Sequence, residues 1–192
     1  MNIGLIIGII IIAIALWVVW AYNAFIRLIN RTDEAWADID VQLKRRYDLI
    51  PNLVETVKGY AAHERGTLDE VTQARTQATQ VHVDPKNITP EQIQAMAGAE
   101  AALTQSLGKL LAISENYPDL KANENFLSLQ DQLEGTENRI TQERKNFNTS
   151  VQDFNSHIRH FPTNLLVGIF GFSPKGYFQA QEGSEKAPTV QF

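Results

Sequence analysis

An uninterrupted apolar run at the start of the chain constrains the fold more than any other feature. Every residue from Ile3 to Trp20 is apolar or glycine, and the first charged residue is Arg27. A helix rises about 1.5 Å per residue and the hydrocarbon core of a bilayer is about 30 Å thick, so a helix over this run is long enough to cross a membrane. We therefore expect residues 1–31 to form a transmembrane anchor and juxtamembrane segment.

The alternative interpretation of this run is a cleaved signal peptide. Ala13-Ile14-Ala15 resembles a cleavage site, but the apolar run continues through Leu16 to Trp20 instead of ending there. Met1-Asn2 also lacks the Lys or Arg that is typical of the start of a signal peptide. We therefore favour a retained anchor.

Six residues within the run and at its end are expected to define the anchor. They are Ile3, Gly4, Gly8, Trp17, Trp20 and Tyr22. The three aromatic residues fit the belt in which amphipathic rings lie at the level of the lipid headgroups. The two glycines form one G-x-x-x-G, which would let two anchors approach closely, although ordinary glycine use in a membrane helix is the simpler explanation.

Basic residues follow the anchor and predict its orientation. Arg27 and Arg31 come first, and the run Lys44-Arg45-Arg46 comes soon after. Because Lys and Arg are enriched on the cytoplasmic side of a membrane helix, residues 23–192 are expected in the cytoplasm, with a periplasmic domain as the alternative. The same basic run is also a candidate juxtamembrane docking patch, although a solvated face with salt bridges is the simpler interpretation.

The composition of the chain argues against two classes of function. Its formal net charge is −5 at pH 7, and its only basic run is short, whereas nucleic-acid binding needs clustered cations. It contains no cysteine, so disulfides, cysteine-ligated zinc and thiol catalysis are not available to it.

Apolar residues at helical spacing predict three long helices after the anchor. The first spans residues 32–81, with a kink but no end near Pro51, because proline removes a backbone donor inside a helix. The second begins after Thr89, where Pro90 and Gln92 complete the pattern of a capping box. Its apolar face recurs at helical spacing, and the helix ends near residues 116–118.

The third helix is predicted over residues 119–160. Its aromatic and aliphatic residues recur every seven positions, a spacing typical of coiled-coil packing. They are Phe126, Leu133, Ile140, Phe147, Phe154 and Phe161. Asn148 and Asn155 each follow a phenylalanine of this series; we interpret them as polar residues at the edge of the seam, with a polar binding site as the alternative.

The pattern therefore predicts an all-α protein. An N-terminal transmembrane helix is followed, over residues 32–161, by an elongated antiparallel three-helix (up-down-up) bundle with coiled-coil-like packing. Residues 162–192 form an apolar C-terminal block and a tail, and residues 182–188 read as mobile. In an up-down-up bundle the last helix ends far from the membrane.

Because the C-terminal block would then lie far from lipid, it is expected to contact another subunit, with packing on its own bundle as the alternative. The candidate oligomer contacts are apolar residues of the block and of the chain end, where an extended strand could add to a neighbour. They are Leu165, Leu166, Ile169, Phe170, Phe172, Val190 and Phe192.

No set of residues in the sequence points to catalysis or to a cofactor. His157 and His160 could share a metal, but the usual further ligands are missing from the pattern. His63-Glu64 begins like a zinc-peptidase motif but lacks its second histidine. We therefore predict no catalytic, cofactor-binding or metal-binding residues.

Three stretches of the sequence resemble motifs of the LemA family. Residues 33–64 (DEAWADIDVQLKRRYDLIPNLVETVKGYAAHE) resemble its signature, and residues 117–123 (YPDLKAN) and the pairs at 161–162, 171–172 and 177–178 resemble later motifs in the same order. The resemblance implies an N-terminally anchored bacterial membrane protein with an extended helical domain. Together with the single apolar run, it leads us to expect a single-pass protein of the inner membrane. It supplies no catalytic residues.

Two classes of function fit these features. The first is a non-enzymatic, membrane-anchored scaffold or adaptor that forms a homo-oligomer and organises the bilayer or a membrane protein partner. The alternative is a regulatory accessory subunit of a membrane enzyme such as a protease. The two differ in stoichiometry, because a scaffold should self-assemble when it is purified alone.

Overall fold

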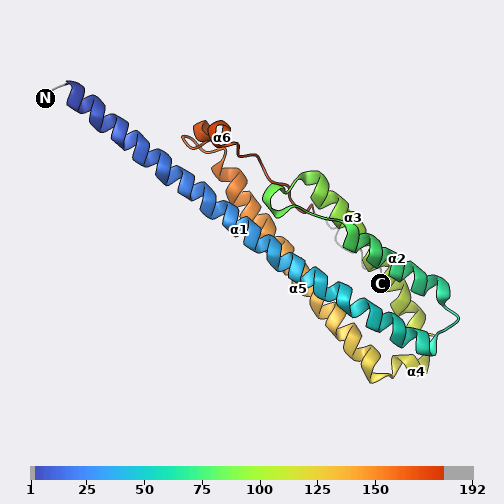
Figure 1. The fold of residues 1–192 in the computed structure, drawn as a ribbon. Coiled ribbons are helices and arrows are strands. Elements are labelled where there is room, and N and C mark those ends of the chain that lie inside the picture. Colours follow the sequence, from blue (N-terminus) through green and yellow to red (C-terminus); the bar gives the residue numbers. More distant parts are fainter. Residues whose placement is uncertain (1–2, 180–192) are drawn as a thin grey trace, which may run out of the picture.

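The computed structural model describes residues 3–179, and it is built from helices, with none of those residues in a strand (Figure 1). The predicted all-α fold with one long apolar N-terminal helix is confirmed. That helix, α1 (Ile3–Tyr60), has 58 residues and is therefore about 87 Å long. It continues through Pro51 without ending, as predicted. Its beginning projects beyond the other helices, and the rest of it runs along the length of an elongated bundle.

The prediction of a single helix over residues 32–81 was wrong. α1 ends at Tyr60, and a separate helix, α2 (Arg65–Gln80), runs back beside it. The Nε–H of Arg75 donates to the backbone carbonyl of Tyr47 at 2.7 Å, which fixes the antiparallel pairing. The apolar spacing persists across this turn because both helices of the hairpin contribute to one core, so periodicity alone did not reveal the reversal.

The third pass of the chain begins as its sequence predicts. After a short turn, η1 (Pro85–Asn87), helix α3 (Pro90–Ser114) opens with Thr89 as its N-cap. The Thr89 hydroxyl accepts from the backbone N–H of Gln92 at 3.3 Å, and the Gln92 side chain accepts from the backbone N–H of Thr89 at 3.1 Å. The predicted capping box is therefore confirmed.

The segment predicted as one last helix is divided near its start and ends early. α4 (Pro118–Lys121) is a single turn, and α5 (Glu124–His157) begins after Asn123, whose side chain accepts from the N–H of Phe126 at 3.0 Å. α6 (Asn164–Phe170) follows, and residues 171–179 then run without regular structure along the bundle.

The chain passes along the bundle four times, and not three times as the predicted arrangement requires. At the end remote from the N-terminus, Asn123 donates to the Tyr60 hydroxyl at 2.9 Å and Tyr117 donates to Glu64 at 3.1 Å. From there α5 runs back along α1 (Figure 1). The last long helix therefore ends beside the apolar start of α1, and the expectation that it ends far from the anchor was wrong.

Three apolar clusters follow one another along the bundle. The first lies at the remote end between α1, α2, α3 and α5, and the second lies in the middle around Trp36 and Phe147. The third joins α1, α5 and α6 next to the apolar segment. The phenylalanines at 126, 147 and 154 from the predicted series are buried in these clusters, as are four residues of α1 that also recur every seven positions, Trp36, Leu43, Ile50 and Val57.

Candidate membrane-proximal site, C-terminal strap and buried polar network

The apolar start of α1 is not covered by the rest of the molecule. No residue in its most apolar 18-residue window is buried, and Trp20 keeps 60% of its surface exposed. By length and composition this segment can cross a membrane. The face with Gly4 and Gly8 is open as well, since no atom lies within 4 Å of the Cβ that a side chain would add at either glycine.

An apolar cluster connects the end of this segment to the last two helices. Ala21 and Phe25 of α1 are buried against Phe154 of α5, against Ile158 directly after α5, and against Leu166 of α6. The helices meet here because α5 has returned along the whole length of the bundle.

Aromatic contacts extend this cluster to the C-terminal side of α6. The rings of Tyr22 and Phe170 have centroids 4.9 Å apart, and those of Phe25 and Phe172 have centroids 4.6 Å apart. Trp17 and Val18, one turn closer to the N-terminus, also pack against the cluster. α6 is therefore held at the level where the apolar segment of α1 joins the bundle.

The residues predicted as oligomer contacts divide into buried and exposed groups. Leu166 lies inside the cluster of its own chain, with Phe170 and Phe172 half-buried against it. Leu166 is therefore not available to a second subunit, and this part of the prediction was wrong. Leu165 and Ile169 are 62% and 74% exposed, so they remain available.

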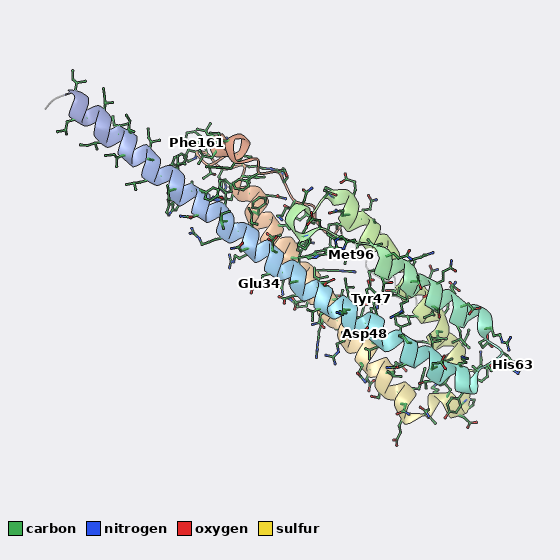
Figure 2. The ribbon with its side chains drawn as sticks, viewed as in Figure 1. Glu34, Tyr47, Asp48, His63, Met96 and Phe161 are labelled. Atoms are coloured by element: carbon green, nitrogen blue, oxygen red, sulfur yellow. The ribbon has the colours of Figure 1, made fainter. Side chains whose placement is uncertain are left out.

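Phe161 does not continue the buried seam of the last helix. α5 ends at His157, and Phe161 is 80% exposed in the turn before α6 (Figure 2). The prediction that it shares the seam was therefore wrong. Val190 and Phe192 and residues 182–188 lie outside the described residues, so the predictions for them stay open.

Two asparagines of α5 hold the segment that follows α6, residues 173–179, which we call the C-terminal strap. Asn155 donates to the carbonyl of Lys175 and accepts from its N–H, both at 2.9 Å. Asn148 donates to the carbonyl of Phe178 at 2.8 Å and accepts from its N–H at 2.9 Å. Each side-chain amide satisfies both backbone groups of one residue, as a neighbouring strand would.

Aromatic packing fixes the end of the strap. The Phe178 ring lies 6.3 Å from the ring of Trp36, nearly parallel to it, and 5.6 Å from the ring of Phe147. The guanidinium of Arg144 lies 5.1 Å from the centroid of the Phe178 ring, within cation–π distance. The strap thus closes the middle cluster of the bundle.

The centre of the strap approaches the start of α3 so closely that only glycine fits. A Cβ at Gly176 would lie 2.8 Å from the Cα of Pro90, and the Gly176 N–H donates to the carbonyl of Ile88 at 3.3 Å. Beside it, the buried Lys175 ammonium lies 3.5 Å from a carboxylate oxygen of Asp33. The strap therefore ties α1, α3 and α5 together.

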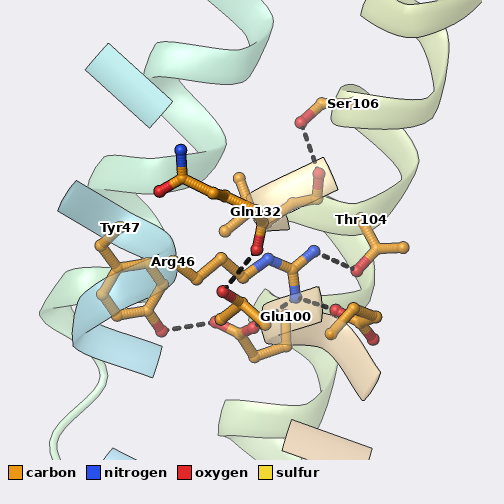
Figure 3. Close-up of polar contacts among 9 residues, drawn as sticks. Arg46, Tyr47, Glu100, Thr104, Ser106 and Gln132 are labelled. Carbon is orange, nitrogen blue, oxygen red and sulfur yellow. Dashed lines mark hydrogen bonds and ion pairs between the residues drawn. The ribbon is translucent and has the colours of Figure 1, made fainter. Parts of the chain in front are cut away.

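A buried polar network connects the same three helices further along the bundle (Figure 3). Arg46 of α1 bonds to the carboxylates of Glu100 on α3 at 3.1 Å and Glu137 on α5 at 2.7 Å. It also donates to the hydroxyl of Thr104 at 2.8 Å, and the Tyr47 hydroxyl donates to the other oxygen of Glu100. Because an unpaired charge is costly in a core, this network favours one register of the helices over others.

The network keeps its aromatic hydroxyl protonated. Burial raises the pKa of Tyr47 well above its usual range, and its bond to the Glu100 carboxylate raises that pKa further. Burial lowers the pKa of the nearby Arg144, an effect that the carboxylates of Glu100 and Glu137 oppose. Tyr47 is therefore a fixed hydrogen-bond donor to Glu100.

The proposed docking patch is not a continuous surface. Lys44 and Arg45 are exposed, but Arg46 is only 4% exposed and is bonded inside the bundle. Including Arg46 was wrong because it lies on the buried side of α1, next to Leu43. The patch is also about 36 Å along the helix from Trp20, so it does not lie at the headgroups.

The histidines do not assemble a metal site within the described residues. No three His, Cys, Asp or Glu side chains of residues 3–179 are placed to hold a metal ion together. The ring of His157 instead packs edge-on against Phe25, with centroids 4.8 Å apart. His63 lies at the remote turn between α1 and α2 (Figure 2).

The strap and the buried network were not predicted as sites from the sequence. Asn148 and Asn155 were noted, and the spacing of seven between them was the available signal, but their partners lie 30 and 20 residues after them in the sequence. Arg46 was assigned to the surface because it follows Lys44 and Arg45. Only its position one turn after the buried Leu43 distinguishes it from them.

Comparisons with known proteins give the same family as the sequence motifs. The model of the LemA family matches residues 35–192. The magnetosome protein MamQ 2 of Paramagnetospirillum magneticum is 25% identical over 181 residues, which cover 85% of this chain and 66% of the relative. The protein LemA of Metamycoplasma hominis is 28% identical over 160 residues, which cover 83% of this chain and 69% of the relative.

The chain therefore spans about two thirds of the length of each of these relatives. The family match covers well over half of the chain and includes the bundle, the strap and α6. This chain belongs to the LemA family.

Proposed function

We propose that this chain is a membrane-anchored, non-enzymatic helical scaffold or adaptor that self-associates and organises membrane or partner proteins. The observation that carries the proposal is the uncovered apolar segment of α1, which continues without a break into the helix that supports the bundle. An exposed apolar surface of that size needs lipid or another helix around it.

The continuity of α1 supports a rigid connection between anchor and bundle. The helix that carries Trp20 also carries Trp36 and Ile50, which are buried in the clusters of the bundle. Residues 21–60 extend about 60 Å beyond the anchor. A protein of this shape holds a binding surface at a fixed distance from the bilayer, which suits an adaptor.

Charge supports a cytoplasmic bundle at the bacterial inner membrane. Arg27 and Arg31 are exposed on α1 just beyond the apolar segment, where the positive-inside rule favours the cytoplasm. A reporter that is active only outside the cytoplasm, fused after Phe192, is expected to be silent. A strong signal from that fusion would reverse the orientation.

Native mass spectrometry of the detergent-solubilised full chain, purified alone, tests the scaffold. We expect a defined homo-oligomer that persists on dilution. A monomer that assembles only when a membrane protease or another enzyme is added would favour the alternative, a regulatory accessory subunit, and would contradict the scaffold.

Variants in the anchor locate the contact between subunits. Gly4→Leu and Gly8→Leu fill space that is open in the single chain, so the bundle should melt unchanged. If oligomers are lost in these variants, the contact lies on this face of the anchor, since close helix approach needs small residues there. The matched control is Gly98→Leu, because Gly98 is equally open but lies on α3.

A further inference from the structure

The C-terminal block has two faces with different surroundings. One face packs on the molecule through Leu166, Val167 and Phe170. The other carries Leu165 and Ile169, which lie four residues apart and therefore on the same side of α6. Exposed apolar side chains of this size gathered at one place indicate a contact with lipid or protein.

The position of α6 relative to the anchor decides between these partners. Phe170 of α6 contacts Tyr22, and Trp17 and Val18 near the end of the apolar segment pack against the same cluster as α6. A bilayer that surrounds that segment must end near this level. With seven residues, α6 is about 10 Å long and cannot cross the membrane, so any contact that it makes with lipid is in the interface.

The charges at this end of the molecule match a phospholipid surface. Arg27, Arg31 and Arg159 are exposed around the apolar cluster, and His160 and the exposed Phe161 follow directly. Neither residues 3–32 nor residues 154–172 contain an acidic residue. Cations beside exposed apolar side chains are the composition of a segment that lies on anionic lipid.

We propose that α6, together with Phe161, is a second membrane contact, which inserts its exposed apolar face into the leaflet next to the anchor. Lipid then covers Leu165 and Ile169, and the arginines contact the phosphates. The inference rests on the proposed membrane anchoring by α1, but not on self-association. It means that the bundle is attached at two points and cannot rotate freely about the anchor.

The test uses the full chain in vesicles of phosphatidylcholine and phosphatidylglycerol. Because the chain has no cysteine, one cysteine can be introduced at a time and labelled with an environment-sensitive fluorophore. The labelled positions are Leu165→Cys and Ile169→Cys on α6, Ile10→Cys in the anchor, and Gln132→Cys on the exposed side of α5 as the control.

Lipids with a nitroxide either at the headgroup side or deep in the acyl chain are then compared as quenchers. We expect the two α6 labels to shift to shorter wavelength and to lose more fluorescence to the shallow nitroxide than to the deep one. The Ile10 label should lose more to the deep nitroxide, and the Gln132 label should respond to neither.

Two results would overturn the inference. If a water-soluble quencher reaches the α6 labels as easily as the Gln132 label, the face is solvated. If the α6 labels are shielded from water, are not quenched by either lipid, and become exposed when the vesicles contain less protein, a second copy covers the face. If the Ile10 label alone is not quenched by the lipid nitroxides, the proposed anchoring by α1 is refuted instead. The two proposals can therefore fail separately.

Discussion

Asn155 gives the sharpest test of how the C-terminal strap is held. Its side chain is 4% exposed, and it satisfies both the N–H and the carbonyl of Lys175. Asn155→Leu keeps the volume of the side chain and removes both bonds. Each buried polar group that is left unpaired costs about 1–3 kcal/mol. With the N–H and the carbonyl of Lys175 both unpaired, the free energy that holds the strap on the bundle should fall by about 2–6 kcal/mol.

The measured loss in global stability should be smaller than this sum. The strap can detach while α1, α3 and α5 remain packed, and local opening then limits the cost to the free energy that holds the strap. We expect chemical denaturation to report about 2–3 kcal/mol. Amide hydrogen exchange should report the larger effect, with lost protection at Lys175 and Phe178 and little change in the middle of α5.

Asn146→Leu is the matched control for this experiment. Asn146 lies on the exposed side of the same helix and bonds only to side chains of its own turn, Gln142 and Glu143. Its replacement should change stability by about 0.5 kcal/mol or less. If exchange at Lys175 is the same in the Asn155→Leu protein as in the unaltered one, the asparagine does not hold the strap and our reasoning is refuted.

Three further predictions test the core, the strap and the half-buried His157. Ile140→Asp should unfold the bundle, as measured by circular dichroism, because a buried unpaired charge costs several kcal/mol. Arg139→Asp, on the exposed side of α5, should melt at the normal temperature, and equal melting of the two variants would refute the assigned seam. Gly176→Ala should release the strap and cost about 1–3 kcal/mol, because the new methyl overlaps backbone; unchanged exchange protection of the strap would contradict this. Burial, and then the charge of His160, lower the pKa of His157, so the unfolded chain binds more protons in acid. The neutral His157 should therefore contribute fully to stability above pH about 6.5, and this contribution should decline as the pH falls through the lowered folded-state pKa. If the melting temperature of the His157→Gln protein depends on pH as strongly as that of the unaltered protein, the effect belongs to another group.

Much of the fold could be predicted because long amphipathic helices leave a clear periodic signal. The apolar run from Ile3 identified the anchor-like segment, and Thr89 with Gln92 located the start of α3. The turn after Tyr60 could not be predicted in the same way, because α2 begins without a side-chain cap and its apolar residues keep the spacing of α1. A hairpin whose two helices face one core has the same periodicity as a single helix.

That missed turn also explains the error in the candidate site. An odd number of passes places the C-terminal block far from the anchor, whereas four passes place it beside Tyr22. The aromatic contacts of the block and the strap bonds of Asn155 depend on this arrangement, and neither is encoded by a local pattern. Arg46 was misplaced for a related reason, because its partners Glu100 and Glu137 are distant in the sequence.

The strap, the apolar cluster and the second membrane contact all depend on the return of α5 to the anchor. Spin labels on Asn23→Cys and His160→Cys in the reconstituted full chain measure it directly by pulsed electron resonance. Phe25 lies two residues after Asn23 and His157 lies three residues before His160, and the rings of Phe25 and His157 have centroids 4.8 Å apart. The two labels should therefore be about 20 Å apart or less. A distance of about 60 Å or more, as a bundle of three passes requires, would contradict the four-pass fold.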